Sequence, residues 1–336
     1  MTSEQVIDRP TAQPRRREVV VSGRRVKVVD MHAHCSVPEA QALMSGRARR
    51  GDSQSTLPLG SVQGRLANMD QQGIDVEALS INPYWYEADP DLAGQVITLQ
   101  NEKLADFVQT ERERFVALAS VALQHPELAA EQLETGMKKY GLKGALIGGS
   151  VNGQELADPR FHPFWAKAEE LQAVIFIHPQ GTPELESRLQ GNGGLTNTIG
   201  NPLETTIALS HLIFEGTLDR FPGLKILAAH GGGYLPSYAH RSDAVCTTFP
   251  DRYKPLKKNP TEYLKQLYFD SLVFTPEALR HLVAEAGVSQ VVLGTDYPYP
   301  WTSTAVDHVL NTPDLSDEDR VAILGGTAAK LLRLDT

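Results

Sequence analysis

The stretch VVDMHAHC, residues 28–35, joins a run of apolar residues to two histidines that stand one residue apart. In an extended strand, residues i and i+2 point to the same face, so the rings of His32 and His34 would stand side by side. They occur where the apolar run stops, which is the predicted exit of a buried strand. Two imidazoles in that place indicate a metal chelate at the end of a strand.

Similar apolar segments, rich in β-branched residues, recur along the whole chain. Amphipathic stretches with helical periodicity lie between nearly all of them. The segments are apolar on both faces, as parallel strands covered by helices require. The predicted strands are the eight segments 24–34, 73–82, 114–123, 142–150, 172–180, 223–232, 265–274 and 289–298.

Eight strand–helix units favour an α/β fold of the (β/α)8 TIM barrel type. Such a barrel takes about 250 residues, and a chain of 336 residues leaves room for an extension and longer loops. A doubly wound sheet would normally carry a Gly-rich phosphate loop after its first strand, where this chain has HAHCSVPEA. We predict an N-terminal extension over 1–23, a single catalytic barrel domain over 24–336, and a long loop over the barrel mouth at 45–61.

The composition narrows the class of protein. A net charge of -9 gives no reason to expect binding to nucleic acid or to an anionic membrane. The first thirty residues contain no apolar stretch of signal-peptide length, and no later run is long enough to span a membrane. Two cysteines are too few for a disulfide scaffold. We therefore expect a soluble, cytoplasmic protein.

Polar side chains stand at the ends of four predicted strands. In a parallel barrel all strands end at the same rim, so residues far apart in sequence converge there. Any one strand-end histidine alone could equally be a hydrogen-bonded rim residue, but the set together predicts a metal site. The set is His32 and His34 after the first strand, His178 after the fifth, His230 after the sixth and Asp296 after the eighth.

The donor types narrow the choice of ion. Imidazoles with one carboxylate suit zinc, and also manganese or iron(II), and zinc is favoured because a His-rich set with an open position is its usual catalytic arrangement. Three histidines and one aspartate would hold the ion, which leaves a position for water or a substrate oxygen. Cys35 would face away from the two histidines beside it, so we expect it to be a small buried residue.

Four collinear motifs, DMHAH, FIHPQ, AAHGGG and LGTDYP, carry a resemblance to a known family. From about Val28 to the C-terminus the chain resembles the amidohydrolase superfamily of metal-dependent hydrolases. Within it, the chain is most similar to the branch of aminocarboxymuconate semialdehyde decarboxylase and related nonoxidative decarboxylases. The stretches MDQQGIDVEALS, HGGGYLPSYAHRSD and YFDSLVFTPEAL extend the resemblance.

The resemblance implies roles for the strand-end residues. His32, His34, His178 and Asp296 would bind the ion, and His230 would be an acid/base beside it, with Asp296 also taking part in catalysis. Binuclear relatives bridge two metals with a modified lysine at the end of the fourth strand. This chain has GALIGGS there, with Lys143 at the strand's beginning, so we expect one divalent ion, Zn²⁺ in preference to Mn²⁺.

Four further residues are candidate substrate contacts. Arg241 matches a family position that binds a substrate carboxylate, and its alternative is an ordinary surface arginine. Asn197 stands where the semialdehyde decarboxylase carries an active-site tryptophan. Trp85 and Trp301 could line a flat pocket for a ring, or could be plain packing. The loop after the first strand offers further candidates, Arg47, Arg49 and Arg50.

The resemblance implies a carboxy-lyase that acts on an aromatic, hydroxybenzoate-like acid or on a carboxymuconate-type acid, as a homodimer or higher homo-oligomer. Direct loss of carbon dioxide from an aromatic or vinylic carbon would leave a localised carbanion. His230 or Asp296 would therefore protonate that carbon before the carbon dioxide leaves. The same residues would also serve a carbon-carbon hydrolase or hydratase of a ring-cleavage product, or an amide or lactone hydrolase. A non-catalytic metal-binding protein on the same barrel is the remaining alternative.

Overall fold

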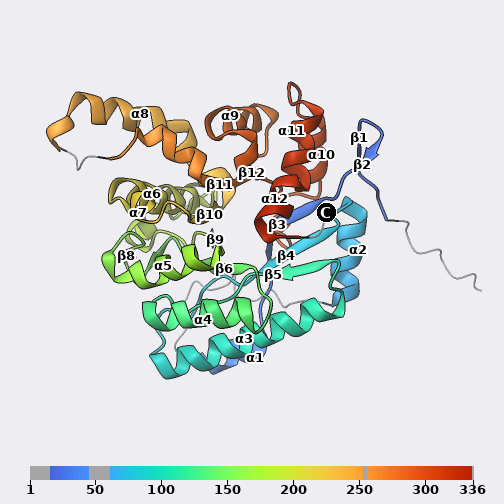
Figure 1. Ribbon diagram of the computed structural model, residues 1–336, viewed down its shortest axis with the longest axis horizontal. Helices are drawn as coiled ribbons and strands as arrows, with labels where there is room; N and C mark the ends of the chain where they lie inside the picture. Colours follow the sequence, from blue (N-terminus) through green and yellow to red (C-terminus); the bar gives the residue numbers. More distant parts are fainter. Residues whose placement is uncertain (1–15, 45–60, 253–255, 335–336) are drawn as a thin grey trace, which may run out of the picture.

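The structure, a computed structural model, describes residues 16–44, 61–252 and 256–334. At its centre eight parallel strands form a ring in the order in which they follow along the chain (Figure 1). They are β3 (Val29–His34), β4 (Val76–Ser80), β5 (Phe115–Ala117), β6 (Gly144–Ile147), β9 (Val174–Ile177), β10 (Lys225–Ala228), β11 (Leu267–Asp270) and β12 (Val291–Val292). The expected (β/α)8 barrel is confirmed.

Two isolated parallel bridges close the ring. Ala119 pairs with Ala145, which joins β5 to β6, and Ala33 pairs with Tyr297, which joins β3 to the segment after β12. The backbone N–H of Met31 also donates to the carbonyl of Leu293 over 2.9 Å. The first and last strands are therefore neighbours, although nearly the whole chain separates them.

Helices cover the outside of the ring (Figure 1). A serine precedes helix α2 (Val62–Gln72) and a glycine ends it. The Ser61 side chain accepts from the N–H of Gly64, and Gly73 takes a left-handed conformation with φ 81°. The helices are α1 (Pro38–Leu43), α2 (Val62–Gln72), α3 (Pro90–Thr110), α4 (Pro126–Lys138), α5 (His162–Leu171), α6 (Asn201–Phe214), α7 (Thr217–Arg220), α8 (Leu235–Thr248), α9 (Pro276–Ala286), α10 (Ala305–Asn311), α11 (Asp317–Val321) and α12 (Thr327–Leu332).

The predicted first strand, 24–34, is two pieces. Its start forms β2 (Arg24–Arg25), which turns back antiparallel onto β1 (Val20–Val21). Ser22 and Gly23, both at positive φ, make the turn between the two strands. The boundary predicted between residues 23 and 24 therefore falls inside this hairpin. The barrel strand itself begins only at Val29, where parallel pairing with β4 starts.

The long predicted strands elsewhere are shortened at the rim. The segment 265–274 ends as a strand at Asp270, and 289–298 pairs as a regular strand only over Val291–Val292. Beyond these points the backbone leaves the extended conformation, and Phe274 and Asp296 both lie at positive φ. These bends place side chains at the mouth of the barrel. The apolar pattern located each strand but could not show where its ladder stops.

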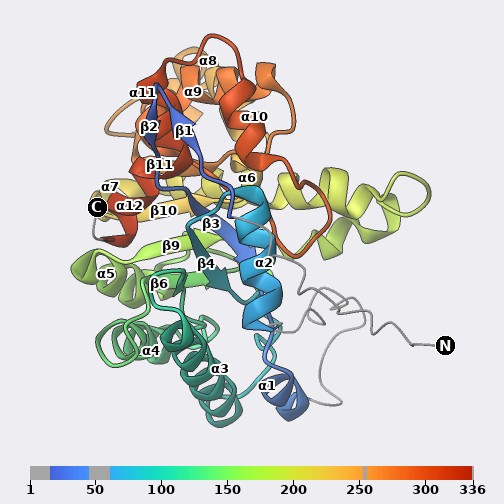
Figure 2. The ribbon, with the colours of Figure 1, turned by 90° about the vertical axis from the view of Figure 1, so that its right-hand side faces the viewer.

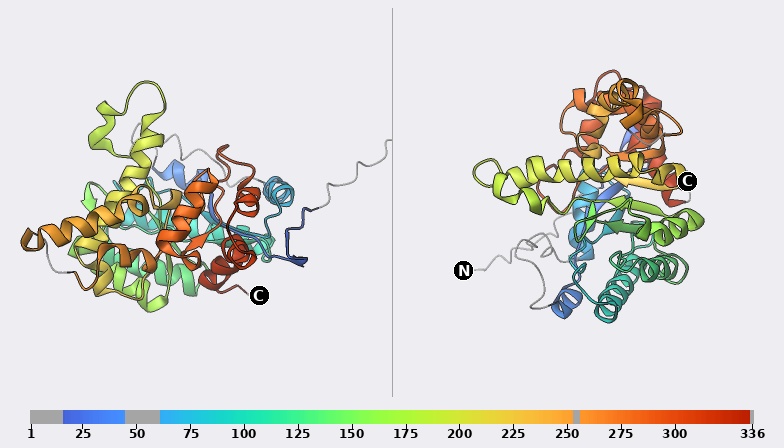
Figure 3. Two further views of the ribbon diagram at one scale, coloured as in Figure 1. Left: turned by 90° about the horizontal axis from the view of Figure 1, so that it is seen from above. Right: turned by 90° about the vertical axis from the view of Figure 1, so that its left-hand side faces the viewer.

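The segment between β9 and α6 projects from the body of the barrel (Figures 2 and 3). It contains η3 (Pro183–Arg188) and the π-helical turn η4 (Thr196–Gly200), which runs directly into α6. No helix within the described ranges is long and apolar enough to cross a membrane.

The interior of the ring is filled by side chains. Met31, Leu146, Phe176 and Leu227 are completely buried and belong to one apolar cluster. The ring of Phe176 meets the edge of His32 with centroids 4.8 Å apart. A packed apolar layer therefore forms the floor beneath the strand-end histidines.

Candidate metal centre

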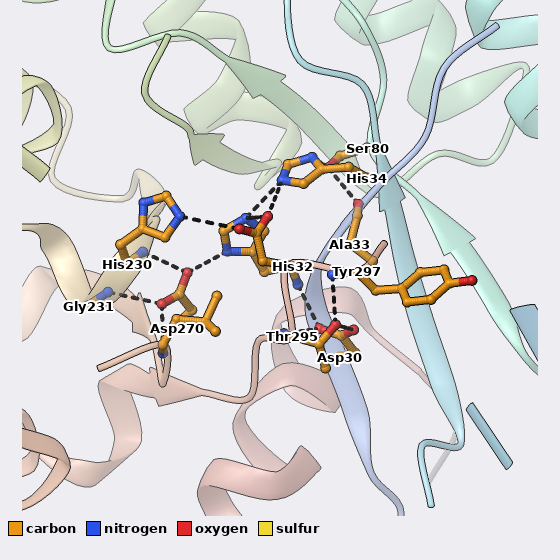
Figure 4. A network of polar contacts seen from close by, with 12 residues as sticks. Asp30, His32, Ala33, His34, Ser80, His230, Gly231, Asp270, Thr295 and Tyr297 are labelled. Atoms are coloured by element: carbon orange, nitrogen blue, oxygen red, sulfur yellow. Dashed lines mark hydrogen bonds and ion pairs between the residues drawn. The ribbon is translucent and has the colours of Figure 1, made fainter. Parts of the chain in front are cut away.

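The residues predicted to converge lie together at the carboxyl end of the barrel. Figure 4 shows three of them, His32, His34 and His230, side by side. His32 and His34 come from the end of β3, and Asp296 follows β12 on the neighbouring segment. His178 directly follows β9, and His230 stands two residues after β10. Except for His230, whose side chain is 20% exposed, all are buried.

The distances inside this cluster are short. Nε2 of His32 lies 2.9 Å from Nε2 of His34. Oδ1 of Asp296 lies 3.2 Å from the first of these nitrogens and 3.0 Å from the second. Two ligand atoms that share an ion at 2.0–2.1 Å with angles of 90° to 109° stand about 2.9 to 3.4 Å apart. The spacing is that of ligands around one ion.

The outer nitrogen of each of the two neighbouring histidines has a polar partner. Nδ1 of His32 lies 2.7 Å from Oδ2 of Asp270. Nδ1 of His34 lies 3.4 Å from Oγ of Ser80, which donates its own hydrogen to the carbonyl of Ala33. Both Nδ1 atoms therefore have a partner outside the cluster, and the two Nε2 atoms face each other beside Oδ1 of Asp296. A cation between them would be coordinated by both Nε2 atoms, with the rings oriented through their outer nitrogens.

His178 supplies a second sign of a missing partner. Both of its ring nitrogens are buried and accept or donate no hydrogen bond within the described part of the chain. Ligand atoms of His32, His178, His230 and Asp296 all lie within 4.8 Å of one another. His178 is thus a buried imidazole that has no hydrogen-bond partner within the described residues and that lies beside other imidazoles and a carboxylate. This arrangement fits a divalent metal ion.

Electrostatics also suit metal binding. Burial lowers the pKa of His34 to about 4 and that of His178 well below its usual value, so both rings are neutral at pH 7. Burial alone would lower the pKa of His32 as well, but the carboxylates of Asp296 and Asp270 outweigh it and raise that pKa to about 10. The acidic side chains thus hold positive charge in this position.

Asp270 is a site residue that the sequence analysis missed. It ends β11, is completely buried, and accepts from Nδ1 of His32 and from the backbone N–H groups of His230 at 2.8 Å and Gly231 at 2.9 Å. Figure 4 shows it between the two histidines. Asp270 lies inside the predicted strand 265–274, and an acid in the middle of that apolar segment was the signal that could have found it.

A second missed carboxylate supports the backbone after His178. Glu204 of α6 is buried, and its Oε2 accepts from the N–H groups of Gln180 at 2.5 Å and Gly181 at 2.6 Å. Burial raises the pKa of Glu204 to about 7. No motif marks this residue, because it reaches the site only through the docking of α6 against the end of β9.

The backbone at two cluster residues is held in an unusual conformation. His230 and Asp296 have φ of 54° and 61°, in the left-handed region that side chains other than glycine seldom adopt. The glycines after His230 permit the tight turn: a Cβ at Gly233 would lie 2.1 Å from the carbonyl oxygen of Pro202. The HGGG sequence therefore allows close backbone packing that aims His230 at the cluster.

The first and last strands are clamped beside the cluster by Asp30. Its carboxylate accepts from the N–H and the hydroxyl of Thr295 and from the N–H of His32. Behind His34, the buried guanidinium of Arg65 donates to the carbonyl of His34 and to Glu77, both at 2.5 Å. These contacts fix the backbone that carries the two histidines and the aspartate.

The predicted substrate contacts lie in different surroundings. Trp85 is completely buried and donates from Nε1 to the carbonyl of Val121, which places it in the core. Arg241 on α8 and Asn197 in η4 are exposed, and no contact within the described residues joins either to the cluster. Trp301 is 49% exposed and stacks on Tyr299, whose ring centroid lies 5.7 Å from that of His34.

Three remaining expectations have simple outcomes. Cys35 is buried, as expected. Lys143 directly precedes β6, at the end of the barrel opposite to the cluster. Arg47, Arg49, Arg50 and the predicted loop over the mouth, except Ser61, lie outside the described residues.

Known proteins resemble this chain over most of its length. A 2-amino-3-carboxymuconate-6-semialdehyde decarboxylase of Dictyostelium discoideum is 32% identical over 312 residues, with 91% of this chain and 85% of the relative covered. A 5-carboxyvanillate decarboxylase from Sphingomonas paucimobilis has a similar structure, with a TM-score of 0.84 and 26% identity over 92% of this chain and 100% of the other.

A third protein is a dihydroxybenzoic acid decarboxylase from Polaromonas, solved with manganese and the inhibitor 2-nitroresorcinol. Its TM-score is 0.81 with 27% identity, over 93% of this chain and 98% of the other. The sequence profile of the Amidohydrolase family matches residues 29–334, which span the whole barrel and the cluster described above. The resemblance of the four strand-end motifs is thus confirmed, and the chain belongs to the amidohydrolase family.

Proposed function

We propose that this protein is a metal-dependent nonoxidative decarboxylase, a carboxy-lyase that acts on a small aromatic acid of the hydroxybenzoate type or on a carboxymuconate-type acid. The single observation that carries the proposal is the buried cluster in which Nε2 of His32, Nε2 of His34 and Oδ1 of Asp296 lie 2.9 to 3.2 Å from one another. The relatives named above, which are decarboxylases of such acids, support the choice of reaction.

In this proposal His32, His34, His178 and Asp296 hold one divalent ion. Zinc is favoured by the His-rich donor set, and manganese is the alternative because the Polaromonas decarboxylase was solved with it. When bound, the ion draws electron density from the substrate's carboxylate or a neighbouring hydroxyl and fixes the ring in place. We further propose that the protein works in the cytoplasm, as a homodimer or higher homo-oligomer.

His230 is the proton donor in this scheme. Its side chain is the most exposed of the cluster, so it is the cluster residue that a substrate in solution reaches most easily. Its Nε2 lies 3.8 Å from Oδ2 of Asp296, and its backbone is held by Asp270. His230 gives its proton to the ring carbon that bears the carboxylate, the carbon–carbon bond breaks, and carbon dioxide leaves as the conjugation returns. At that distance the carboxylate of Asp296 helps to orient the ring of His230.

Burial also excludes water from the reacting carbon. The cluster rests on the apolar side chains of the barrel interior, with Phe176 against His32. A cluster with low water access strengthens the electrostatic contacts within it and slows hydrolytic side reactions. This favours protonation of carbon over attack by water.

The test is release of carbon dioxide from a panel of acids by the metal-loaded protein. The panel contains 2,6-dihydroxybenzoate, 5-carboxyvanillate and 2-amino-3-carboxymuconate semialdehyde, with benzamide and a simple lactone to detect hydrolysis. We expect one of the acids to lose carbon dioxide with the matching decarboxylated product. Hydrolysis without any release of carbon dioxide would overturn the proposal in favour of a hydrolase.

A further inference from the structure

A cavity lies beside the metal centre, between the loop that follows β11 and the start of α10. Its volume is about 470 Å³, within the range of pockets that bind small molecules. Ser271 and Gly294 line it on the side of the barrel, and His308 lines it from α10. Phe274 and Trp301 also line it and are among the most exposed large apolar residues of the described chain.

The two aromatic residues make walls suited to a flat ring. Phe274 is 62% exposed and Trp301 is 49% exposed. Phe274 stands at φ 59°, a conformation unfavourable for a residue with a Cβ, and Trp301 stacks on Tyr299 with an interplanar angle of 23°. Exposed aromatic rings that are held in place are favourable contacts for a planar aromatic ligand.

Two buried polar atoms belong to residues that line this cavity and have no partner. Ser271 is 3% exposed, and its Oγ makes no hydrogen bond within the described chain. Nε2 of His308 is also buried and unpartnered. Each of these two atoms has hydrogen-bonding capacity that no described residue uses. A hydroxyl group, which both donates and accepts, can satisfy them.

The charges around the cavity select against an anion. The one charged side chain among the described lining residues is Asp307, which accepts two hydrogen bonds from Arg17 at 2.9 Å and 2.5 Å. Burial lowers the pKa of His308, so its ring stays neutral near pH 7. Because Arg17 balances Asp307, no cation among the described lining residues is left to pair with a carboxylate in the cavity, whereas a neutral hydroxyl needs none.

Only a thin wall separates the cavity from the metal centre. Ser271 directly follows Asp270, which holds His32. A Cβ at Gly294 would lie 2.9 Å from the Cβ atoms of both Asp270 and His32. On the other side, Trp301 connects through Tyr299 to His34. A molecule that leaves the cluster therefore has this cavity beside it.

We infer that the cavity is a second binding site, separate from the metal, for a neutral hydroxylated aromatic ring. The assignment of this ring as the reaction's product rests on the proposed function, since a hydroxylated aromatic acid that loses carbon dioxide becomes a neutral phenol. The anionic substrate stays at the metal, and the neutral product is the form that the cavity accepts.

Two matched probes test this in the metal-loaded protein: 4-bromophenol, which is neutral at pH 7, and 4-bromobenzoate, which is anionic. Of the three tryptophans, Trp85 and Trp165 are completely buried and only Trp301 is exposed, so a bromine atom in the cavity quenches the fluorescence of Trp301. The anomalous X-ray signal of bromine then locates each probe. We expect 4-bromophenol in the cavity with saturable quenching, and 4-bromobenzoate there at least ten-fold more weakly.

Variants identify the residues that bind the probe. Ser271→Ala should weaken 4-bromophenol binding about two- to ten-fold through loss of one hydrogen bond. Phe274→Ala should weaken it by about ten-fold through loss of a ring contact. Phe249→Ala, which removes a 40% exposed ring after α8, is the matched control and should leave the affinity unchanged.

The outcomes separate this inference from the proposed function. A decarboxylase that releases carbon dioxide but binds 4-bromophenol only at the metal, or with unchanged affinity in both variants, overturns the inference alone. Equal binding of 4-bromobenzoate in the cavity overturns it as well. A protein that releases no carbon dioxide from any acid but holds 4-bromophenol in the cavity keeps the ring site and loses the proposed function.

Discussion

Asp270 accepts a hydrogen bond from Nδ1 of His32 over 2.7 Å, and both side chains are completely buried. The same carboxylate accepts from the backbone N–H of His230. One acid on β11 therefore orients a proposed metal ligand from β3 and positions the proposed proton donor after β10. Such a partner fixes the tautomer of a ligating histidine and strengthens its basicity.

We predict that Asp270→Asn lowers metal affinity about 10- to 100-fold, because the amide offers one acceptor oxygen where the carboxylate offers two. Competition with a chelator of known affinity measures this. Asp243→Asn is the control, since Asp243 on α8 bonds Thr261 away from the cluster. Unchanged metal affinity in Asp270→Asn would show that His32 needs no orienting partner.

His230→Ala and His178→Ala separate proton transfer from metal binding. His230→Ala should keep the bound metal and lose about 10²- to 10⁴-fold in turnover, the usual value of acid/base help. His178→Ala should lower metal occupancy as well. Elemental analysis with a decarboxylation assay distinguishes them. Because His230 offers a ligand atom within 4.8 Å of the others, loss of metal in His230→Ala would move it into the ligand set.

Removal of the metal should abolish release of carbon dioxide. Chelator treatment followed by dialysis gives the apoprotein, and stepwise addition of Zn²⁺ or Mn²⁺ should restore activity with one equivalent per chain. The ion that gives the higher turnover at equal occupancy identifies the working metal. Turnover retained after complete removal of metal would contradict the proposed scheme.

Glu204→Gln should change how stability depends on pH. Burial raises the pKa of Glu204 from 4.5 to about 7, so the folded protein loses stability on that account as the pH rises from about 4.5 to 7. The variant keeps an oxygen for the N–H groups of Gln180 and Gly181 but does not ionise. Relative to the parent, its unfolding free energy should rise by up to about 3 kcal/mol between pH 4.5 and 8.

Urea unfolding at a series of pH values measures this difference. The control is Glu186→Gln, an exposed carboxyl in η3 on the same projecting segment. A difference between Glu204→Gln and the parent that stays constant with pH would mean that Glu204 is already ionised throughout this range.

The sequence predicted the barrel and the convergence of its strand-end residues because both depend on local periodicity and on one geometric rule. Every predicted segment contains a strand of the barrel, and the side chains at the ends of β3, β9, β10 and β12 meet at one rim. The sequence could not identify Asp270 or Glu204, since each acts through a neighbour that only the closed ring supplies.

The two tryptophans show most clearly what strand periodicity cannot predict. Trp85 and Trp301 both follow strands and look equivalent in sequence. In the structure Trp85 turns inward to bond Val121, whereas Trp301 stays 49% exposed at the rim. The direction of a side chain beyond the last ladder residue depends on loop conformation, for which strand periodicity gives no rule.

The bridge between Ala33 and Tyr297, and the clamp of Asp30 on Thr295 across 265 residues, bear on how the protein matures. During synthesis on the ribosome His32 and His34 of the first barrel strand are made early, and Asp296 after the last barrel strand is made near the end. Neither half of the polypeptide holds a complete set of donors. An ion held by the proposed set would therefore bind only after nearly the entire chain has been translated, and it would link the two ends of the closed ring.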